Sequence, residues 1–337
     1  MTSSFPENPV LVRALRGGVI ESQHRGSWAL VDSSGSLLEG AGACEEPIFA
    51  RSSVKAFQAL PLVESGAAER FAYTDSELAL ALSSHNAEAV HTDGVRAILD
   101  RIGLSVTDLQ CGPQEPNDPS QRAALRERGE APTSVHNNCS GKHAGFLALA
   151  LHLGASVSDY LDPHAEPQLL VRQALADMSG VDSERLWFAI DGCSAPTWRL
   201  PLSGLATAFA RVANPEGLSV ERRAACAWMQ RAVAAHPGMI AGEHQRLCTD
   251  LARITEGRLF PKIGAEGVYG IGVRGGDRGL ALKMDDGVGR GLHALVLALL
   301  ERFDFATREE LVALRTWRGN PITNRAGQEV GSLEVLA

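Results

Sequence analysis

The chain has 337 residues, of which 45% are hydrophobic and 21% are charged, and its formal net charge is −8. This composition is ordinary for a globular protein with a sizeable core, and the acidic balance excludes a general nucleic-acid binder. The six cysteines are widely spread rather than set in a disulfide framework, and no run of 18 apolar residues or secretion-type leader is present, so we expect a cytoplasmic protein without membrane contact.

The first 45 residues predict a β-meander with strands over 10–15, 19–22, 28–32 and 36–38, separated by turns rich in glycine and serine. A helix is expected from Ser52 towards Leu60, where Pro61 kinks or ends it. Further helices are expected over 75–82 and 87–102. Four prolines make 108–138 a loop-rich segment.

The middle of the chain is mostly helical, with expected helices over 142–153, 167–178, 203–212 and 220–235 and one short strand over 186–190. Strands return over 258–263, 267–273 and 279–284, and a helix follows over 289–303. Strands at both ends therefore flank a helical middle. We predict an α/β fold of the α+β type, with a central, mostly antiparallel sheet from both chain ends and a helical lobe. One two-lobed catalytic domain would cover 1–337, with the sheet lobe at about 1–60 and 255–337 and the helical lobe at about 61–254.

Lysine is rare in this chain, with four lysines (Lys55, Lys142, Lys262 and Lys283) against 28 arginines. Arginine does not lose its proton in a protein, whereas a crowded or buried lysine can. Lys55 follows Ser52 by three positions at the expected helix start, so their side chains share one face, where free backbone N–H groups suit an oxyanion. This pattern predicts a serine nucleophile and a neutral lysine base. A genome biased towards arginine codons is the alternative interpretation.

Two later motifs extend this pattern. Ser84-His85-Asn86 and Lys262-Ile263-Gly264 follow Ser52-x-x-Lys55 in the order seen in penicillin-binding proteins and serine β-lactamases. If Lys55 and Lys262 face one cleft, like charges disfavour protonation, and one amine is neutral near pH 7. One Ser–Lys pair would then attack while the other moves protons. The alternative is a polar helix end at Ser84 and a surface lysine at position 262.

A third constellation runs from His136 to His143 and is joined by Asp191-Gly192-Cys193 further along the chain. Cys139 would lie at a helix start and Cys193 just after a strand. Two thiolates with a neighbouring histidine or lysine could hold zinc. Lysine is an unusual metal ligand, and buried free thiols or a nucleophilic or redox pair of cysteines are the alternative interpretations. The cysteines without such a context are read as structural: Cys44, Cys111, Cys226 and Cys248.

These motifs together resemble one family, the asparaginase II-type proteins, also described as Rhizobium-type or class 3 L-asparaginases. The resemblance covers nearly the whole chain, and its motifs occur in order. It is carried by residues 16–26, 51–58, 83–86, 136–143, 191–193 and 236–242.

The resemblance implies an amidohydrolase that turns L-asparagine into L-aspartate and ammonia, in a homodimer with a fold like serine β-lactamases and glutaminases. By position, Ser52 would be the nucleophile beside Lys55, and Ser84 would pair with Lys262. The resemblance further implies a zinc seat that helps substrate binding and is not strictly required, at Cys139, Lys142 and Cys193. Around the substrate it implies Arg51, His143 and Asp191.

Two other functions fit parts of the pattern. A related serine amidohydrolase, either a glutaminase or a β-lactamase-like enzyme, would use the same serines. The β-lactamase interpretation is weaker because the later motifs are Ser-His-Asn and Lys-Ile-Gly rather than Ser-Asp-Asn and Lys-Thr-Gly. A non-catalytic protein that binds zinc or an amino acid would use Cys139, Cys193 and His143 but would not need Ser52 and Lys55.

Overall fold

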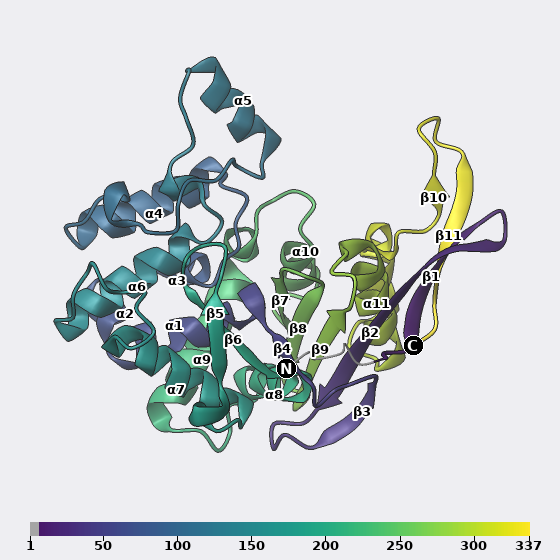
Figure 1. Cartoon of the computed structure of the whole chain (residues 1–337), viewed down its shortest axis with the longest axis horizontal. Coiled ribbons are helices and arrows are strands. Elements are labelled where there is room, and N and C mark those ends of the chain that lie inside the picture. The colour runs from purple at the N-terminus through teal and green to yellow at the C-terminus, as the bar shows by residue number, and fades with distance from the viewer. Residues whose placement is uncertain (1–6) are drawn as a thin grey trace.

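The computed structural model describes residues 7–337, in which an antiparallel sheet lies beside a large group of helices (Figure 1). The main sheet has eight strands, and all of its pairings are antiparallel. The strand order is β10-β11-β1-β2-β9-β8-β7, with β3 also paired to β2. The strands are β1 (Val10–Arg16), β2 (Val19–Val31), β3 (Leu37–Ala41), β7 (Leu259–Gly264), β8 (Val268–Val273), β9 (Arg278–Met284), β10 (Ile322–Thr323) and β11 (Glu329–Val335). A central antiparallel sheet built from both chain ends confirms the predicted fold class.

Strand β2 is one continuous strand of 13 residues, where the sequence predicts two separate strands. Its polar stretch lacks the apolar alternation of a half-buried strand, but its backbone is paired along its length, first with β1 and then with β9. Gln23 and His24 lie opposite β1, and Gly26 and Ser27 lie opposite β9. Backbone pairing to two neighbours therefore keeps this polar stretch extended.

The helices are mostly where the apolar periodicity predicts them. They are α1 (Lys55–Glu64), α2 (Ala67–Arg70), α3 (Asp75–Ala81), α4 (Ala89–Arg101), α5 (Pro119–Glu127), α6 (Ser140–Leu153), α7 (Glu166–Ser179), α8 (Leu202–Ala213), α9 (Val220–Ala235), α10 (Leu247–Ile254), α11 (Gly289–Arg302) and α12 (Arg308–Ala313). Helix α1 continues past Pro61 to Glu64, so the proline neither ends it there nor prevents the last turn. No helix within residues 7–337 is long and apolar enough to cross a membrane.

Helix α5 lies inside the segment that the prolines predict to be a loop. Asp118 accepts a hydrogen bond from the Gln121 backbone N–H at 2.9 Å, and Pro119 occupies the first helical position. An N-cap aspartate followed by proline is a helix-start signal, so the proline here begins a helix. A small second sheet was also missed in part, because its strands are short: β4 (Pro47–Phe49), β5 (Trp187–Ile190) and β6 (Pro196–Pro201), in the order β4-β6-β5.

Helix α8 is the main contact between the helices and the sheet, and it packs closely on β8 and β9. Glycines make this approach possible. A Cβ added at Gly270 would lie 1.8 Å from Phe209 Cε2, and one at Gly279 would lie 2.0 Å from the Ala206 carbonyl oxygen. Any larger residue would push the helix off the sheet.

The edge strand β7 and the helices meet at the 3-10 helix η1 (Arg51–Val54), which contacts β7 and leads into α1. Figure 1 shows α1, α3 and α6 on the side of β7 away from β1 and β2. Residues from the first, middle and last thirds of the chain are thereby brought to one place.

Candidate active site

Ser52 and Lys55 lie where η1 runs into α1. Arg51 has a φ of 51°, a left-handed conformation that non-glycine residues rarely adopt, so the surrounding structure holds this turn against strain. The Lys55 side chain is 1% exposed, and its amine donates to Ser84 Oγ at 3.0 Å and to the Ser83 carbonyl at 2.5 Å. Ser52 is half-buried, and its hydroxyl makes no hydrogen bond to another described residue. Lys55 is therefore hydrogen-bonded to Ser84, and no hydrogen bond joins its amine to Ser52, the partner that the Ser-x-x-Lys spacing predicts.

Ser84 follows α3, and Lys262 reaches it from β7. The Lys262 amine lies 2.9 Å from Ser84 Oγ and 3.0 Å from the Ile263 carbonyl oxygen. Lys262 is 3% exposed and Ser84 is 6% exposed. The predicted pairing of Ser84 with Lys262 is thus present in the geometry. Because Lys55 reaches the same hydroxyl, the three side chains form one buried chain, Lys55–Ser84–Lys262.

Both lysines of the hydrogen-bonded chain Lys55–Ser84–Lys262 lie in surroundings that favour the neutral amine. Burial, together with the charge of Lys55, lowers the pKa of Lys262 to about 7. Burial also lowers the pKa of Lys55, and the charge of Lys142 adds to this effect, while Cys139 opposes it. An amine with a pKa near 7 is neutral in about half of the molecules at that pH, so it can both accept and return a proton.

Arg246 contacts the Lys55–Ser84–Lys262 chain through the Ser84 carbonyl. No sequence pattern distinguishes it among the 28 arginines of the protein. It precedes α10, and its guanidinium donates to the Ser84 carbonyl at 2.6 Å and to Asn86 Oδ1 at 2.5 Å. Its positive charge contributes to the lowered pKa of Lys262. In a protein with few arginines this residue would stand out in the sequence, as the four lysines do here.

The two thiols and the third lysine meet beside the Ser–Lys chain. Cys139 occupies the N-cap position of α6, Lys142 lies in the first turn of this helix, and Cys193 follows β5. The Lys142 amine lies 3.3 Å from Cys193 Sγ, and all three side chains are buried. A hydrogen bond from the Cys193 thiol is the main cause that lowers the pKa of Cys139 well below its usual value, and the pKa of Cys193 is raised in turn. Burial lowers the pKa of Lys142, but the charges of Cys193, Cys139 and Asp191 outweigh burial and raise it.

This set offers two sulfur donors and one nitrogen donor, which is the chemistry that zinc prefers. Residues 7–337 contain no cluster of three histidine, cysteine or acidic side chains that could hold a metal ion. A zinc site here would therefore need Lys142 as its third protein ligand, in the neutral form. The residues fit zinc on that condition, and binding would release the Lys142 proton.

His143 lies on the same helix but is fully buried and turned to another partner. Its Nδ1 lies 2.7 Å from the Tyr160 hydroxyl, and its Nε2 has no hydrogen-bond partner among the described residues. Burial, together with the charges of Lys142 and Lys55, lowers the pKa of His143 well below its usual value. The ring is therefore neutral, with one polar atom free.

Arg51 and Asp191 form an ion pair at the outer side of the site. Two guanidinium nitrogens of Arg51 lie 3.0 and 2.8 Å from Asp191 Oδ1. Burial raises the pKa of Asp191, but the Gly192 backbone N–H and Arg51 outweigh it and lower the value. Both residues line a groove of about 760 Å³, whose walls include the exposed side chains of Trp187 and Ile190. The charge of Arg51 is thus already compensated.

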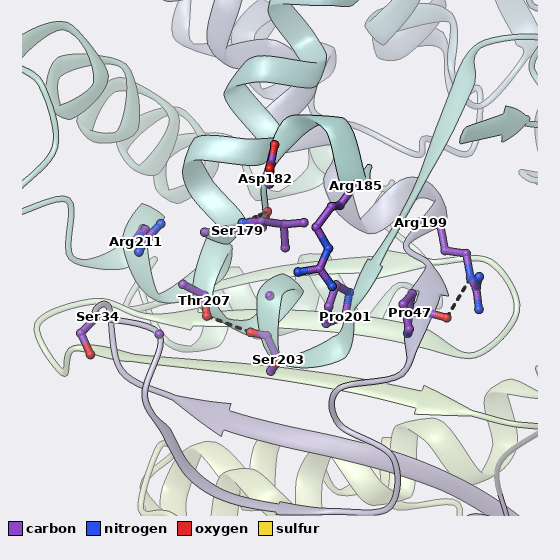
Figure 2. A pocket seen from close by; sticks show the side chains of 14 residues that line it. Ser34, Pro47, Ser179, Asp182, Arg185, Arg199, Pro201, Ser203, Thr207 and Arg211 are labelled. Atoms are coloured by element: carbon purple, nitrogen blue, oxygen red, sulfur yellow. Dashed lines mark hydrogen bonds between the residues drawn. The ribbon is translucent and has the colours of Figure 1, made fainter. Parts of the chain in front are cut away.

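A second hollow, of about 400 Å³, lies between the turn after β2, the end of α7 and the start of α8 (Figure 2). Its arginines mostly serve the fold, since Arg211 donates to the Ser33 carbonyl at 3.0 Å and Arg199 to the Pro47 carbonyl at 3.1 Å. Its lining contains neither a lysine nor a cysteine. It therefore lacks the groups that the Ser–Lys chain combines.

Residues 12–335 match the protein family described as L-asparaginase II. No curated protein matches the chain. Similar solved structures include Mglu in its native form in 4.3 M NaCl, at 15% identity and a TM-score of 0.43, over 83% of this chain and 61% of the Mglu chain. A beta-lactamase from Mycobacterium bovis is 13% identical, with a TM-score of 0.39, over 82% of this chain and 94% of that chain. The chain thus spans less than two thirds of the length of the Mglu chain that it matches.

Proposed function

The chain belongs to the L-asparaginase II family, and we propose that it hydrolyses the side-chain amide of L-asparagine to L-aspartate and ammonia through a serine ester. Membership of the family supports an amidohydrolase of the asparaginase type. The observation that carries the serine mechanism is the buried chain Lys55–Ser84–Lys262, with its 3.0 and 2.9 Å contacts. Amide hydrolysis through a serine needs a base that exchanges protons near neutral pH, and the two lysine amines on Ser84 are candidates for this role.

Ser52 is the nucleophile in this proposal. Its hydroxyl is half-buried and free, so a substrate can reach it, whereas Ser84 is 6% exposed and held between two amines. Ser52 Oγ attacks the amide carbon, and its proton passes to the neutral amine of the Lys55–Ser84–Lys262 chain.

The Lys55–Ser84–Lys262 chain then delivers this proton to the leaving nitrogen. The C–N bond breaks as the leaving nitrogen takes the proton through Ser84, so that ammonia departs and the Ser52 ester remains. Water adds to the ester, and the Ser52 hydroxyl is regenerated with L-aspartate as the second product. One water is consumed for each ammonia released, and the lysines end in their starting state.

Zinc would be held by Cys139, Lys142 and Cys193 when it is bound. It would supply a fixed positive charge that helps to hold the substrate beside the serines. The Arg51–Asp191 pair would face the substrate from the groove, with Asp191 as the acceptor for its α-ammonium group. The homodimer implied by the resemblance stays a prediction.

Replacement of either thiol should abolish most zinc binding at the Cys139–Lys142–Cys193 site. We expect Cys139→Ala and Cys193→Ala to retain less than about a tenth of the zinc that wild type retains after dialysis, because a site with two protein ligands binds weakly. The measurement is zinc per protein by atomic emission, with the zinc-induced rise in Tm as a second readout. Cys226→Ala is the control, since this thiol is buried in α9. Equal zinc content in all four proteins would contradict the assignment.

The proposed activity predicts ammonia release from L-asparagine by the purified full chain. L-Glutamine is assayed in parallel, because a glutaminase would use the same serines. Release from L-asparagine alone supports the proposal, and preference for L-glutamine would make the chain a glutaminase. Release from neither amide by folded, zinc-loaded protein would exclude both.

A further inference from the structure

Three cationic side chains, the buried Lys55 and Lys262 and the half-buried Arg246, meet at Ser84 without an acidic partner. Lys55, Lys262 and Arg246 all bond to Ser84, and none lies within 4.0 Å of a carboxylate oxygen of the described residues. Buried charges are normally paired, and an unpaired one is expensive. Burial favours the neutral form of both lysine amines, but a guanidinium stays charged. Arg246 is therefore the one member that keeps a full positive charge in need of an anion.

The position of the Arg246 guanidinium is fixed by two neutral acceptors. The Ser84 carbonyl and Asn86 Oδ1 accept from its two terminal nitrogens at 2.6 and 2.5 Å. A guanidinium has five N–H groups, and the remaining three make no hydrogen bond to another described residue. These groups form a rigid donor fork, which matches a carboxylate in geometry and in charge.

The other arginine of the site is a poorer anchor. Arg51 already has Asp191 at 2.8 Å and Glu266 at 3.9 Å, so an incoming carboxylate would meet two negative charges there. Arg246 has no such competitor. An anion on Arg246 would also lie beside Ser84, next to the atoms that exchange protons in the proposed reaction.

We propose that Arg246 binds the α-carboxylate of the amino-acid substrate, an inference that rests on the proposed function. In asparagine, three C–C bonds separate the α-carboxylate carbon from the side-chain amide carbon, a span of roughly 4 Å. An α-carboxylate held on the Arg246 fork therefore leaves the amide carbon within reach of the serines. Arg246 is then a substrate-binding residue: by holding the α-carboxylate, it positions the side-chain amide relative to the serines.

The test compares L-asparagine with 3-aminopropanamide, which keeps the amide and the amine but lacks the α-carboxylate. Wild type should prefer L-asparagine in kcat/KM by about 100-fold or more, since a charge-assisted bidentate contact is lost with the analogue. In Arg246→Gln this preference should fall at least tenfold, and mainly through KM for L-asparagine. Arg246→Lys should keep part of the preference. Arg253→Gln is the matched control, because this arginine lies on α10, is exposed and pairs with Glu243; its preference should equal that of wild type.

Binding of L-aspartate and β-alanine by calorimetry repeats the comparison without turnover, and it serves for any variant too slow to assay. An equal loss for both ligands in Arg246→Gln would mean that Arg246 only clamps the Ser84–Asn86 segment, and would overturn the proposal. Turnover by wild type with an unchanged preference in Arg246→Gln would overturn it while the asparaginase activity stands. No turnover by wild type, but binding of L-aspartate over β-alanine that depends on Arg246, would reject the activity and support the anchor.

Discussion

Ser52→Ala is expected to lower kcat for L-asparagine by roughly 10³- to 10⁶-fold while the fold persists, because the variant lacks the oxygen that forms the ester. Ser52 is half-buried and its hydroxyl has no hydrogen bond to another described residue, so its loss should change the free energy of unfolding by less than about 0.5 kcal/mol. Ammonia release and urea unfolding of the same preparations measure the two effects.

Ser53→Ala is the matched control for this variant. The Ser53 hydroxyl is buried and donates to the Ala50 carbonyl at 2.6 Å, so its removal should cost about 1 kcal/mol of stability and leave most of the turnover. Mass spectrometry of wild type quenched during turnover should find the acyl group on Ser52. Full activity in Ser52→Ala together with an acyl group on Ser84 would reverse the roles of the two serines.

The rarity of lysine, more than the spacing of the motifs, is what made the residues of the candidate site predictable. Three of the four lysines that stand out in the sequence converge in the structure, two on Ser84 and one on Cys193. Spacing was less informative, because three positions on a helix determine where the Cβ atoms lie but not where a long side chain ends. The buried Lys55 amine goes to the acceptors that can satisfy it, the Ser83 carbonyl and Ser84 Oγ.

Residues without a distinctive neighbourhood in the sequence could not be predicted. Arg246 is one of 28 arginines, and only tertiary contact with the Ser84–Asn86 segment distinguishes it. The same holds for the fold. Apolar alternation located most strands of the sheet, but the polar middle of β2 is extended because β1 and β9 pair with it. Helix α5 is not predicted because a proline-rich segment indicates a loop, whereas Pro119 directly after the N-cap Asp118 begins a helix.

Lys262→Met should lose turnover and gain stability at pH 7. Methionine nearly matches the shape of lysine but cannot relay a proton, so kcat should fall by roughly 10²- to 10⁴-fold. Wild-type kcat/KM should rise as the pH passes through about 7, where Lys262 loses its proton. A fall in kcat/KM over that window would exclude Lys262 as the neutral member.

The gain in stability follows from the pKa of Lys262, about 7 in the folded protein and about 10.4 in an unfolded chain. Between these values the unfolded state holds one more proton, so this lysine makes wild type more stable by about 1.4 kcal/mol for each unit of rising pH. At pH 7 the buried Lys262 amine therefore destabilises the fold. Lys262→Met removes this destabilisation but also loses the hydrogen bond to Ser84, so the net gain in stability is the difference between the two. Urea unfolding at pH 7 and pH 9 should show an advantage of the variant that shrinks at the higher pH. Equal stability of both proteins at both pH values would mean that Lys262 is charged in the folded state and cannot serve as the base.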